Sequence, residues 1–170
     1  MACLKNRRFY VDNRTLGYGS QDAEGTLGTF VTSISDVQGE LIEDFSFFED
    51  WMDKYRHIIE MGQGLPPLEA DEMRDEFLLK GCQSKVWFVP SWQGGLLNLR
   101  ANSDSSIVAG LIAIMHRLYH GRGAQEILDN PPDVIGHIGL SEHLSPTRQN
   151  GLAALVGAIQ SSAQRQLSGG

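Results

Sequence analysis

The sequence predicts an α+β protein in which helices pack on a small three-stranded antiparallel sheet. Short strand-forming segments between residues 76 and 101 are separated by only a few turn residues, which is typical of an antiparallel meander. On both sides of this region apolar residues recur every three or four positions, which indicates amphipathic helices. A chain of 170 residues with 41% hydrophobic residues is long enough for one domain with a sizeable core.

Residues 1–38 are expected to form a poorly structured N-terminal extension, and residues 39–167 the folded domain. The extension shows no apolar periodicity, and it lacks the apolar stretch of a secretory signal. Cys3 lies in this extension and is assigned no role. A truncated chain that starts near Gly39 is therefore expected to fold and to keep its function.

Two helices are expected before the sheet. The first is predicted over residues 39–45. The second is predicted to begin at a capping box, with Ser46 as the N-cap and Glu49 at the third helical position, and to end at Gly62. His57 is expected to face outward from it. Its inward face combines apolar residues at offsets of three and four: Phe48, Trp51, Met52, Tyr55, Ile58 and Ile59.

Three strands are predicted over residues 76–80, 86–89 and 96–101. Pro90 is expected to close the second strand, because proline cannot donate a hydrogen bond to a neighbouring strand. In the third strand apolar and polar side chains alternate, as they do in a strand with one buried face. Cys82 falls in the turn between the first two strands, near one corner of the sheet.

A long helix is expected after the sheet, with Ser103 or Asp104 as its N-cap and Gly121 at its end. Its apolar face is broad, so this helix should be the most buried one. Its last turns contain His116 and His120, whose positive charge would favour the helix dipole and whose spacing could also hold a metal. Further helices are expected over residues 124–128, 131–139 and 145–164.

The net charge of −7 argues against a nucleic-acid-binding protein. Residues 36–76 contain 13 acidic and three basic residues, whereas residues 77–170 contain five acidic and seven basic residues. The acidic region is interpreted either as a solvated helix face or as a surface that steers a partner. The sequence has no run of about 18 apolar residues, so no membrane-spanning segment is expected.

Cys82 is the strongest candidate for chemistry. It follows Gly81, which allows a sharp turn, and its neighbours in the sequence are polar. Lys80 and Lys85 are expected to favour the thiolate, which is the nucleophilic form of cysteine. The alternative is that Cys82 packs in the core as a small apolar residue. A single reactive thiol fits the reducing cytosol better than a secretory route.

The segment Gly81-Cys82-Gln83-Ser84-x-Val86-Trp87 resembles the active-site motif of the SufE family, whose members accept sulfur from cysteine desulfurases. Further segments that resemble SufE are Asp50-Trp51-x-x-x-Tyr55, Ile58-Ile59-Glu60-x-Gly62-x-x-Leu65-Pro66, Ser103-Asp104-x-x-Ile107-Val108-x-Gly110-Leu111-Ile112-Ala113 and His143-Leu144-Ser145-Pro146-Thr147-Arg148-x-x-Gly151-Leu152. The resemblance covers about residues 40–163. Glu76 and Gly123 depart from the family pattern, and both lie outside the thiol loop.

The resemblance implies that Cys82 accepts persulfide sulfur from a SufS-type cysteine desulfurase, and that the chain stimulates this desulfurase. The sulfur would then pass to an iron–sulfur scaffold of the SufBCD type. The chain would be a cytoplasmic carrier and not an enzyme, and it would have no cofactor of its own, because the pyridoxal phosphate belongs to the desulfurase. A monomer or weak dimer is expected, without a metal and with neither nucleic acid nor membrane as a partner.

The resemblance also implies a set of residues that support the thiol or bind the partner: Gly81, Gln83, Ser84, Asp104, His143 and Arg148. For Arg148 the sequence adds a physical reason. It lies in the first turn of the last predicted helix, where a cation opposes the helix dipole. This unfavourable position suggests that an acidic group elsewhere in the fold or on a partner binds the side chain.

Two other functions remain open at the level of the sequence. The five histidines allow a Cys–His hydrolase or transferase, although no nucleophile-elbow pattern surrounds Cys82. An iron–sulfur scaffold of the IscU type has a similar fold, but it needs about three thiolates. Thiol-dependent turnover of an ester would favour the hydrolase, and iron-dependent colour after reconstitution would favour the scaffold.

Overall fold

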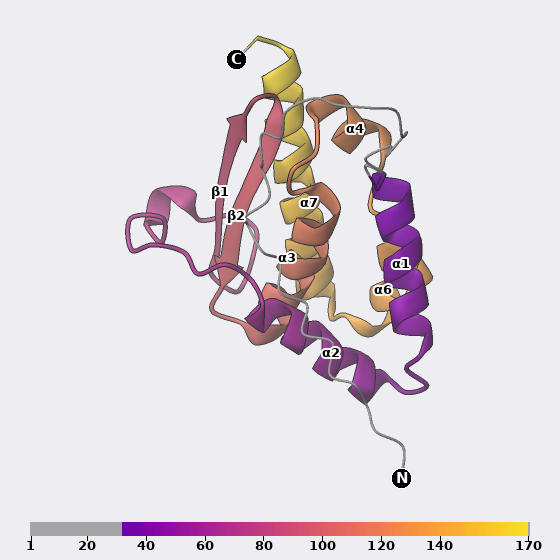
Figure 1. Ribbon diagram of the computed structural model, residues 1–170. Helices are drawn as coiled ribbons and strands as arrows, with labels where there is room; N and C mark the ends of the chain where they lie inside the picture. The colour runs from indigo at the N-terminus through magenta and orange to yellow at the C-terminus, as the bar shows by residue number, and fades with distance from the viewer. Residues whose placement is uncertain (1–31, 170) are drawn as a thin grey trace, which may run out of the picture. The chain divides into compact units, whose positions relative to one another are not determined.

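The computed structural model describes residues 32–169 of the chain, and all structural statements below refer to this part. Its elements are α1 (Ile34–Ser46), α2 (Trp51–Gln63), η1 (Asp75–Phe77), β1 (Val86–Gln93), β2 (Leu96–Ser103), α3 (Ser106–Tyr119), α4 (Ala124–Asp129), α5 (Val134–His137), α6 (Leu140–His143) and α7 (Pro146–Leu167). Figure 1 shows the β1–β2 hairpin beside α3 and α7, with α1 on the other side of α3. Helices thus pack on a small antiparallel sheet, and the predicted α+β class is confirmed.

The sheet in the described part of the chain contains two strands, so the prediction of a three-stranded sheet is wrong. β1 and β2 pair in antiparallel register along their whole length. Gly94 and Gly95 form the turn between them with φ angles of 59° and 81°, which is the conformation that a two-residue hairpin turn needs. β1 also continues past Pro90, which pairs with Leu99. A proline is tolerated here because β1 has no second neighbour at this position.

Residues 76–80, the third predicted strand, adopt a different structure. Residues 75–77 form one turn of 3-10 helix, η1, and only Leu78 pairs with β1, in an isolated bridge opposite Trp87. The antiparallel pairing does not extend past Leu78, because residues 75–77, which would have to pair further along β1, form this 3-10 turn. One bridging residue is too short to form a strand, and the sheet therefore ends at β1.

α3 is the central helix, as predicted, and ten of its 14 residues are buried. It crosses α2 at very short distance. A Cβ on Gly62 would lie 2.6 Å from the backbone nitrogen of Gly110, and a Cβ on Gly110 would overlap the carbonyl oxygen of Ile58. Only glycine permits two helix backbones to approach this closely. The segments before and after the thiol loop are joined through this contact.

α1 begins earlier than predicted. Its capping box starts at Ser33, and Ile34 and Val37 belong to the buried core. The expected start of the domain at residue 39 therefore lies inside a helix, and the residues that follow Ser33 are part of the fold. The rest of the predicted extension, residues 1–31, lies outside the described part of the chain.

α2 begins four residues later than predicted. Its N-cap is Asp50, which accepts a hydrogen bond from the third helical amide at 2.9 Å. Ser46 instead ends α1 and donates to a carbonyl of that helix. Met52 of the predicted inward face is exposed. His57 does not face outward, because its ring packs 5.2 Å from that of Phe45, and burial lowers the pKa of His57.

The four C-terminal helices complete the core. α4 begins at Ala124 and α7 at Pro146, in agreement with the prediction. The predicted helix over residues 131–139 is shorter, and α6 is an additional turn of helix that starts after Gly139. Within residues 32–169 no helix is both long and apolar enough to cross a membrane.

Candidate functional site

The loop between η1 and β1 carries Cys82. Gly81 has a φ of 91°, which residues with a side chain rarely adopt, and the chain therefore turns directly before the thiol. The amide of Leu79 donates a hydrogen bond to the carbonyl of Val86 at 2.9 Å. This bond closes the base of the loop, so that Cys82 is presented by a short, anchored turn.

Asp104 fastens the second end of the loop. Its Oδ1 accepts a hydrogen bond from the amide of Lys85 at 3.0 Å. The hydroxyl of Ser103 donates to the carbonyl of Lys85 at 2.8 Å. Asp104 does not cap α3 as expected, because Ser105 occupies the N-cap position. Its carboxylate holds the thiol loop against the start of α3.

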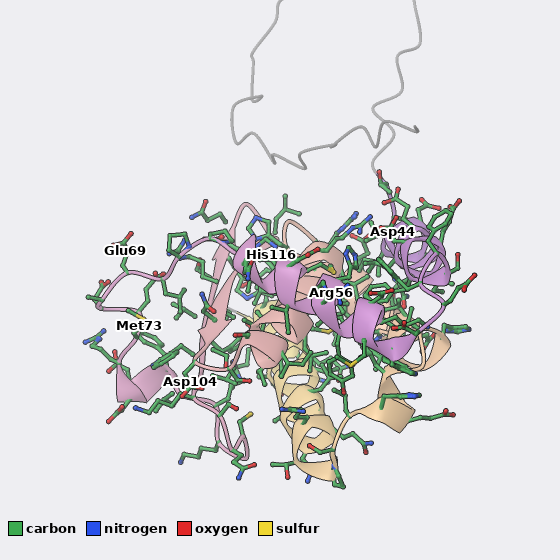
Figure 2. All side chains as sticks on the ribbon, turned by 90° about the horizontal axis from the view of Figure 1, so that it is seen from below. Asp44, Arg56, Glu69, Met73, Asp104 and His116 are labelled. Atoms are coloured by element: carbon green, nitrogen blue, oxygen red, sulfur yellow. The ribbon has the colours of Figure 1, made fainter. Side chains whose placement is uncertain are left out.

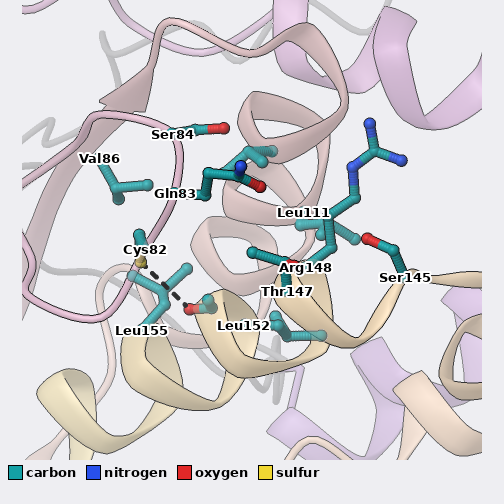
Figure 3. Close-up of a pocket in the computed structure, with 12 residues that line it drawn as sticks. Cys82, Gln83, Ser84, Val86, Leu111, Ser145, Thr147, Arg148, Leu152 and Leu155 are labelled. Carbon is teal, nitrogen blue, oxygen red and sulfur yellow. Dashed lines mark hydrogen bonds between the residues drawn. The ribbon is translucent and has the colours of Figure 1, made fainter.

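Cys82 faces a cavity of about 250 Å³ between its own loop, α3 and the beginning of α7. The thiol donates a long hydrogen bond, 3.8 Å from sulfur to oxygen, to the carbonyl of Gly151 in the first turns of α7 (Figure 3). Polar residues of the loop and of the α7 start share the cavity with apolar residues of β1, α3 and α7. The lining residues are Cys82, Gln83, Ser84, Val86, Val108, Leu111, Ser145, Thr147, Arg148, Gly151, Leu152 and Leu155.

The resting thiol is protonated near neutral pH. Burial raises the pKa of Cys82, because the thiolate would lose part of its hydration. The expectation that Lys80 and Lys85 favour the thiolate is therefore wrong. Both lysines are exposed, and neither offsets the effect of burial on the pKa of Cys82.

The predicted supporting residues fall into three groups. Gln83, Ser84 and Arg148 line the cavity together with Cys82. Gly81 and Asp104 shape and anchor the loop. His143 does not line the cavity; its ring stacks on Trp51 with 3.6 Å between the ring centroids. Figure 3 shows the guanidinium of Arg148 at the edge of the site, directed away from the sulfur.

Several lining residues were not identified as site residues by their sequence, although some belong to the SufE-like motif. Ser145 and Thr147 contribute polar groups, and Gly151 supplies the carbonyl that accepts the thiol hydrogen bond. Leu111 and Leu155 come from helices that looked like ordinary core elements. The SufE-like segment around Pro146 could have indicated Ser145, Thr147 and Gly151, and the segment that begins at Ser103 could have indicated Leu111.

The two histidines at the end of α3 form a stacked pair rather than a metal site. Their ring centroids are 4.4 Å apart, and His120 Nδ1 accepts a hydrogen bond from the amide of Leu99 at 3.2 Å. Burial, with a smaller effect of His120, lowers the pKa of His116 to about 4. His116 is therefore neutral at pH 7 and does not act as a cation on the helix dipole. Among the described residues, no three His, Cys, Asp or Glu side chains are grouped to bind a metal.

Comparisons with known proteins agree with the resemblance. Residues 39–163 match the family model described as SufE: Fe-S metabolism associated domain. An uncharacterized SufE-like protein of Rhizobium meliloti (strain 1021) is 39% identical over 133 residues, which are 75% of this chain and 95% of that protein. A second uncharacterized SufE-like protein, from Rhizobium etli, is 38% identical over 130 residues, which are 74% of this chain and 88% of that protein.

The fold also occurs in a solved structure. The solution structure of a hypothetical protein from Thermus thermophilus matches with a TM-score of 0.65, over 78% of this chain and 96% of that chain. At 19% sequence identity this match shows the fold alone. The family model covers the thiol loop, its anchors and the cavity, and on the basis of this match and the two Rhizobium relatives the chain belongs to the SufE family, which is associated with iron–sulfur metabolism.

Proposed function

We propose that this protein is a sulfur acceptor and carrier that takes persulfide sulfur from a SufS-type cysteine desulfurase onto Cys82. The observation that carries the proposal is the position of this free thiol, which lies on an anchored turn and faces a cavity with room for a further sulfur atom. The desulfurase contributes the pyridoxal phosphate, and the carrier needs no cofactor of its own. The sulfur then passes to a SufBCD-type scaffold in the cytoplasm.

The proposed transfer is a thiol–persulfide exchange without net oxidation. Cys82 loses its proton, and its thiolate attacks the outer sulfur of the persulfide on the desulfurase. A sulfur–sulfur bond forms on Cys82 while the sulfur–sulfur bond of the donor breaks. The donor cysteine leaves as a thiolate, which takes up a proton, so that one proton is released and one is bound. The carrier thus supplies a nucleophile and a site for the product and is not itself an enzyme.

Docking of the desulfurase is proposed to activate the thiol. In the free protein Cys82 is half-buried, bonded to Gly151 and protonated. Attack requires the thiolate and access to the donor sulfur. The partner therefore has to displace the thiol from Gly151 or provide groups that stabilise the thiolate. Gln83, Ser84 and Arg148, which line the same cavity, are positioned for contact with this partner.

The structure gives no support to the two alternatives. All five histidines belong to the described part of the chain, and none of them lines the cavity of Cys82. The Cys–His pair of a hydrolase is therefore not assembled here. For an iron–sulfur scaffold, Cys82 is the one cysteine within residues 32–169, whereas cluster binding needs about three thiolates.

The decisive experiment is incubation with a SufS-type desulfurase and L-cysteine, followed by intact mass measurement. The parent and a Cys3→Ser variant should gain the mass of one sulfur atom, which a reductant removes and peptide mapping assigns to Cys82. Cys82→Ser should gain nothing and should fail to stimulate cysteine turnover, because a hydroxyl has a much higher pKa than a thiol. Sulfur on Cys3, or full stimulation by Cys82→Ser, would contradict the proposal.

A further inference from the structure

Three residues in the connection between α6 and α7 and in the first turn of α7 line the thiol cavity. Ser145, Thr147 and Arg148 all line it, and all three follow α6 within five residues. α6 itself is only four residues long, and a helix of this length has no stability of its own. The position of the cavity rim therefore depends on what holds α6 and the connection in place.

Two aromatic residues of α2 hold both ends of α6. The hydroxyl of Tyr55 donates a hydrogen bond of 2.6 Å to the carbonyl of His143, the last residue of α6. The ring of Trp51 stacks on the imidazole of His143, with a centroid distance of 3.6 Å and an interplanar angle of 24°. The ring of Trp51 also lies close to the start of α6, since a Cβ added to Gly139 would be only 3.2 Å from it. Trp51 and Tyr55 are four residues apart and thus lie on one face of α2.

The connection has little freedom between His143 and Arg148. The buried side chain of Leu144 anchors it in the core. The side-chain amide of Gln149 donates to the carbonyls of Ser141 and Leu144 at 2.6 Å and 3.0 Å. Pro146, the first residue of α7, has a fixed φ angle. A shift of the His143 carbonyl is therefore passed on to the first turn of α7, where Arg148 lies.

We propose that Tyr55 is a positioning residue for the thiol site: its hydroxyl holds the α6–α7 connection, and this keeps the guanidinium of Arg148 at the rim of the Cys82 cavity. Tyr55 lies on a different helix and does not line the cavity. Its effect reaches the site only through His143 and Arg148. For sulfur transfer, the inference rests on the proposed function. The positive charge of Arg148 at the rim would attract anionic groups of the desulfurase.

The first test uses small disulfide reagents and needs no partner. In a Cys3→Ser background, the reaction rate of Cys82 is measured with the anionic dithiobis(nitrobenzoate) and with neutral dipyridyl disulfide at low ionic strength. Arg148→Ala should lower the anionic-to-neutral rate ratio about two- to fivefold, because a rim cation attracts the anion. Tyr55→Phe, which removes one hydroxyl, should lower the ratio in the same direction. High salt should remove both effects.

Tyr119→Phe is the matched control. The hydroxyl of Tyr119 donates to the carbonyl of Asn130 at 3.0 Å, so this variant also loses one tyrosine–carbonyl hydrogen bond, but away from the cavity. It should keep the rate ratio of the parent. Tyr55→Phe should also have no further effect on the ratio in an Arg148→Ala background, because both changes act on the same group.

The second test separates this inference from the proposed function. With the desulfurase, Tyr55→Phe should raise the carrier concentration for half-maximal stimulation several-fold and leave the maximal stimulation unchanged, whereas Tyr119→Phe should match the parent. The positioning role is overturned if Tyr55→Phe keeps the parent rate ratio, or if its effect persists without Arg148. A parent that stimulates no desulfurase contradicts the proposed function alone, since the reagent ratio still decides the role of Tyr55.

Discussion

Cys82 illustrates how strongly one residue depends on its neighbours in space. Its sequence flanks contain two lysines, which suggested an activated thiolate. In the folded chain the lysines are exposed, while the sulfur is half-buried against Gly151. Desolvation is therefore the dominant influence on the thiol, and it favours the neutral form. The neutral thiol is the less nucleophilic form of cysteine.

We expect the thiolate of Cys82 to appear at higher pH in the folded protein than in the unfolded chain. Burial raises the pKa of Cys82, so the folded state keeps its proton at a pH where the unfolded chain has lost it. In a Cys3→Ser variant, the rate of reaction with a neutral disulfide is measured against pH, with and without urea. A midpoint in the folded protein at or below that of the unfolded chain would show that burial does not control this thiol.

At the scale of elements, the crossing of α2 and α3 positions residues of the thiol site. Gly62 and Gly110 have no side chain of their own, and this lets the backbones of the two helices approach each other closely. Val108 and Leu111 of α3 line the cavity, and Tyr55 of α2 donates a hydrogen bond to the α6–α7 connection. The close contact between α2 and α3 therefore sets the distance between the α3 residues that line the cavity and the Tyr55 hydroxyl that binds the α6–α7 connection.

Gly110→Ala should destabilise the protein by about 2 kcal/mol or more, because the added methyl group overlaps the backbone of Ile58. The effect opposes the higher helix propensity of alanine, which alone would stabilise by about 1 kcal/mol. Urea unfolding followed by circular dichroism measures the difference. Gly157→Ala in α7 is the control, since apart from the adjacent backbone of α7 nothing lies within 4 Å of its added Cβ, and it should be neutral or stabilising. Equal stability of the two variants would show that the helices can separate at no cost.

At the scale of the whole molecule, acidic residues of segment 36–76 take part in the internal structure. Some of them are paired within the fold: Arg117 binds Glu40 and Asp44 of α1, and Arg100 binds Glu72. In Figure 2 the labelled Asp44 and Glu69 lie well apart, on opposite sides of the view. Some acidic residues of segment 36–76 therefore form ion pairs within the fold, and two residues of this segment, Asp44 and Glu69, lie far from each other.

A truncated chain that starts at Gly39 should be much less stable than one that starts at Thr32. It lacks Ile34 and Val37, which are 0% and 6% exposed, and each buried side chain of this size contributes about 1.5–3 kcal/mol. The combined loss is a large fraction of the roughly 5–15 kcal/mol by which domains are stable. Thermal unfolding of both chains checks this. Equal melting temperatures would support the boundary at residue 39 that the sequence suggested.

The sequence by itself determined the parts of this protein that depend on local order along the chain. The helix over α3 follows from its broad apolar face, α7 from Ser145 and Pro146, and the hairpin from the glycine pair between two strand-forming segments. The thiol motif and its family could also be identified, because a motif is a linear pattern. Each of these signals is a short stretch of consecutive residues, and the family resemblance combines several such stretches in their order along the chain.

Only the tertiary structure decided what lies beside each of these segments. The partner of the Cys82 thiol is a backbone carbonyl 69 residues away, and the hydroxyl of Tyr55 reaches a carbonyl 88 residues away. Asp104 was predicted to cap a helix, but its carboxylate accepts a hydrogen bond from the amide of Lys85. The third predicted strand does not form, because a 3-10 turn at residues 75–77 overrides the strand propensity of a few residues. Burial, hydrogen-bond partners and pKa shifts arise from such contacts, and spacing along the chain does not encode them.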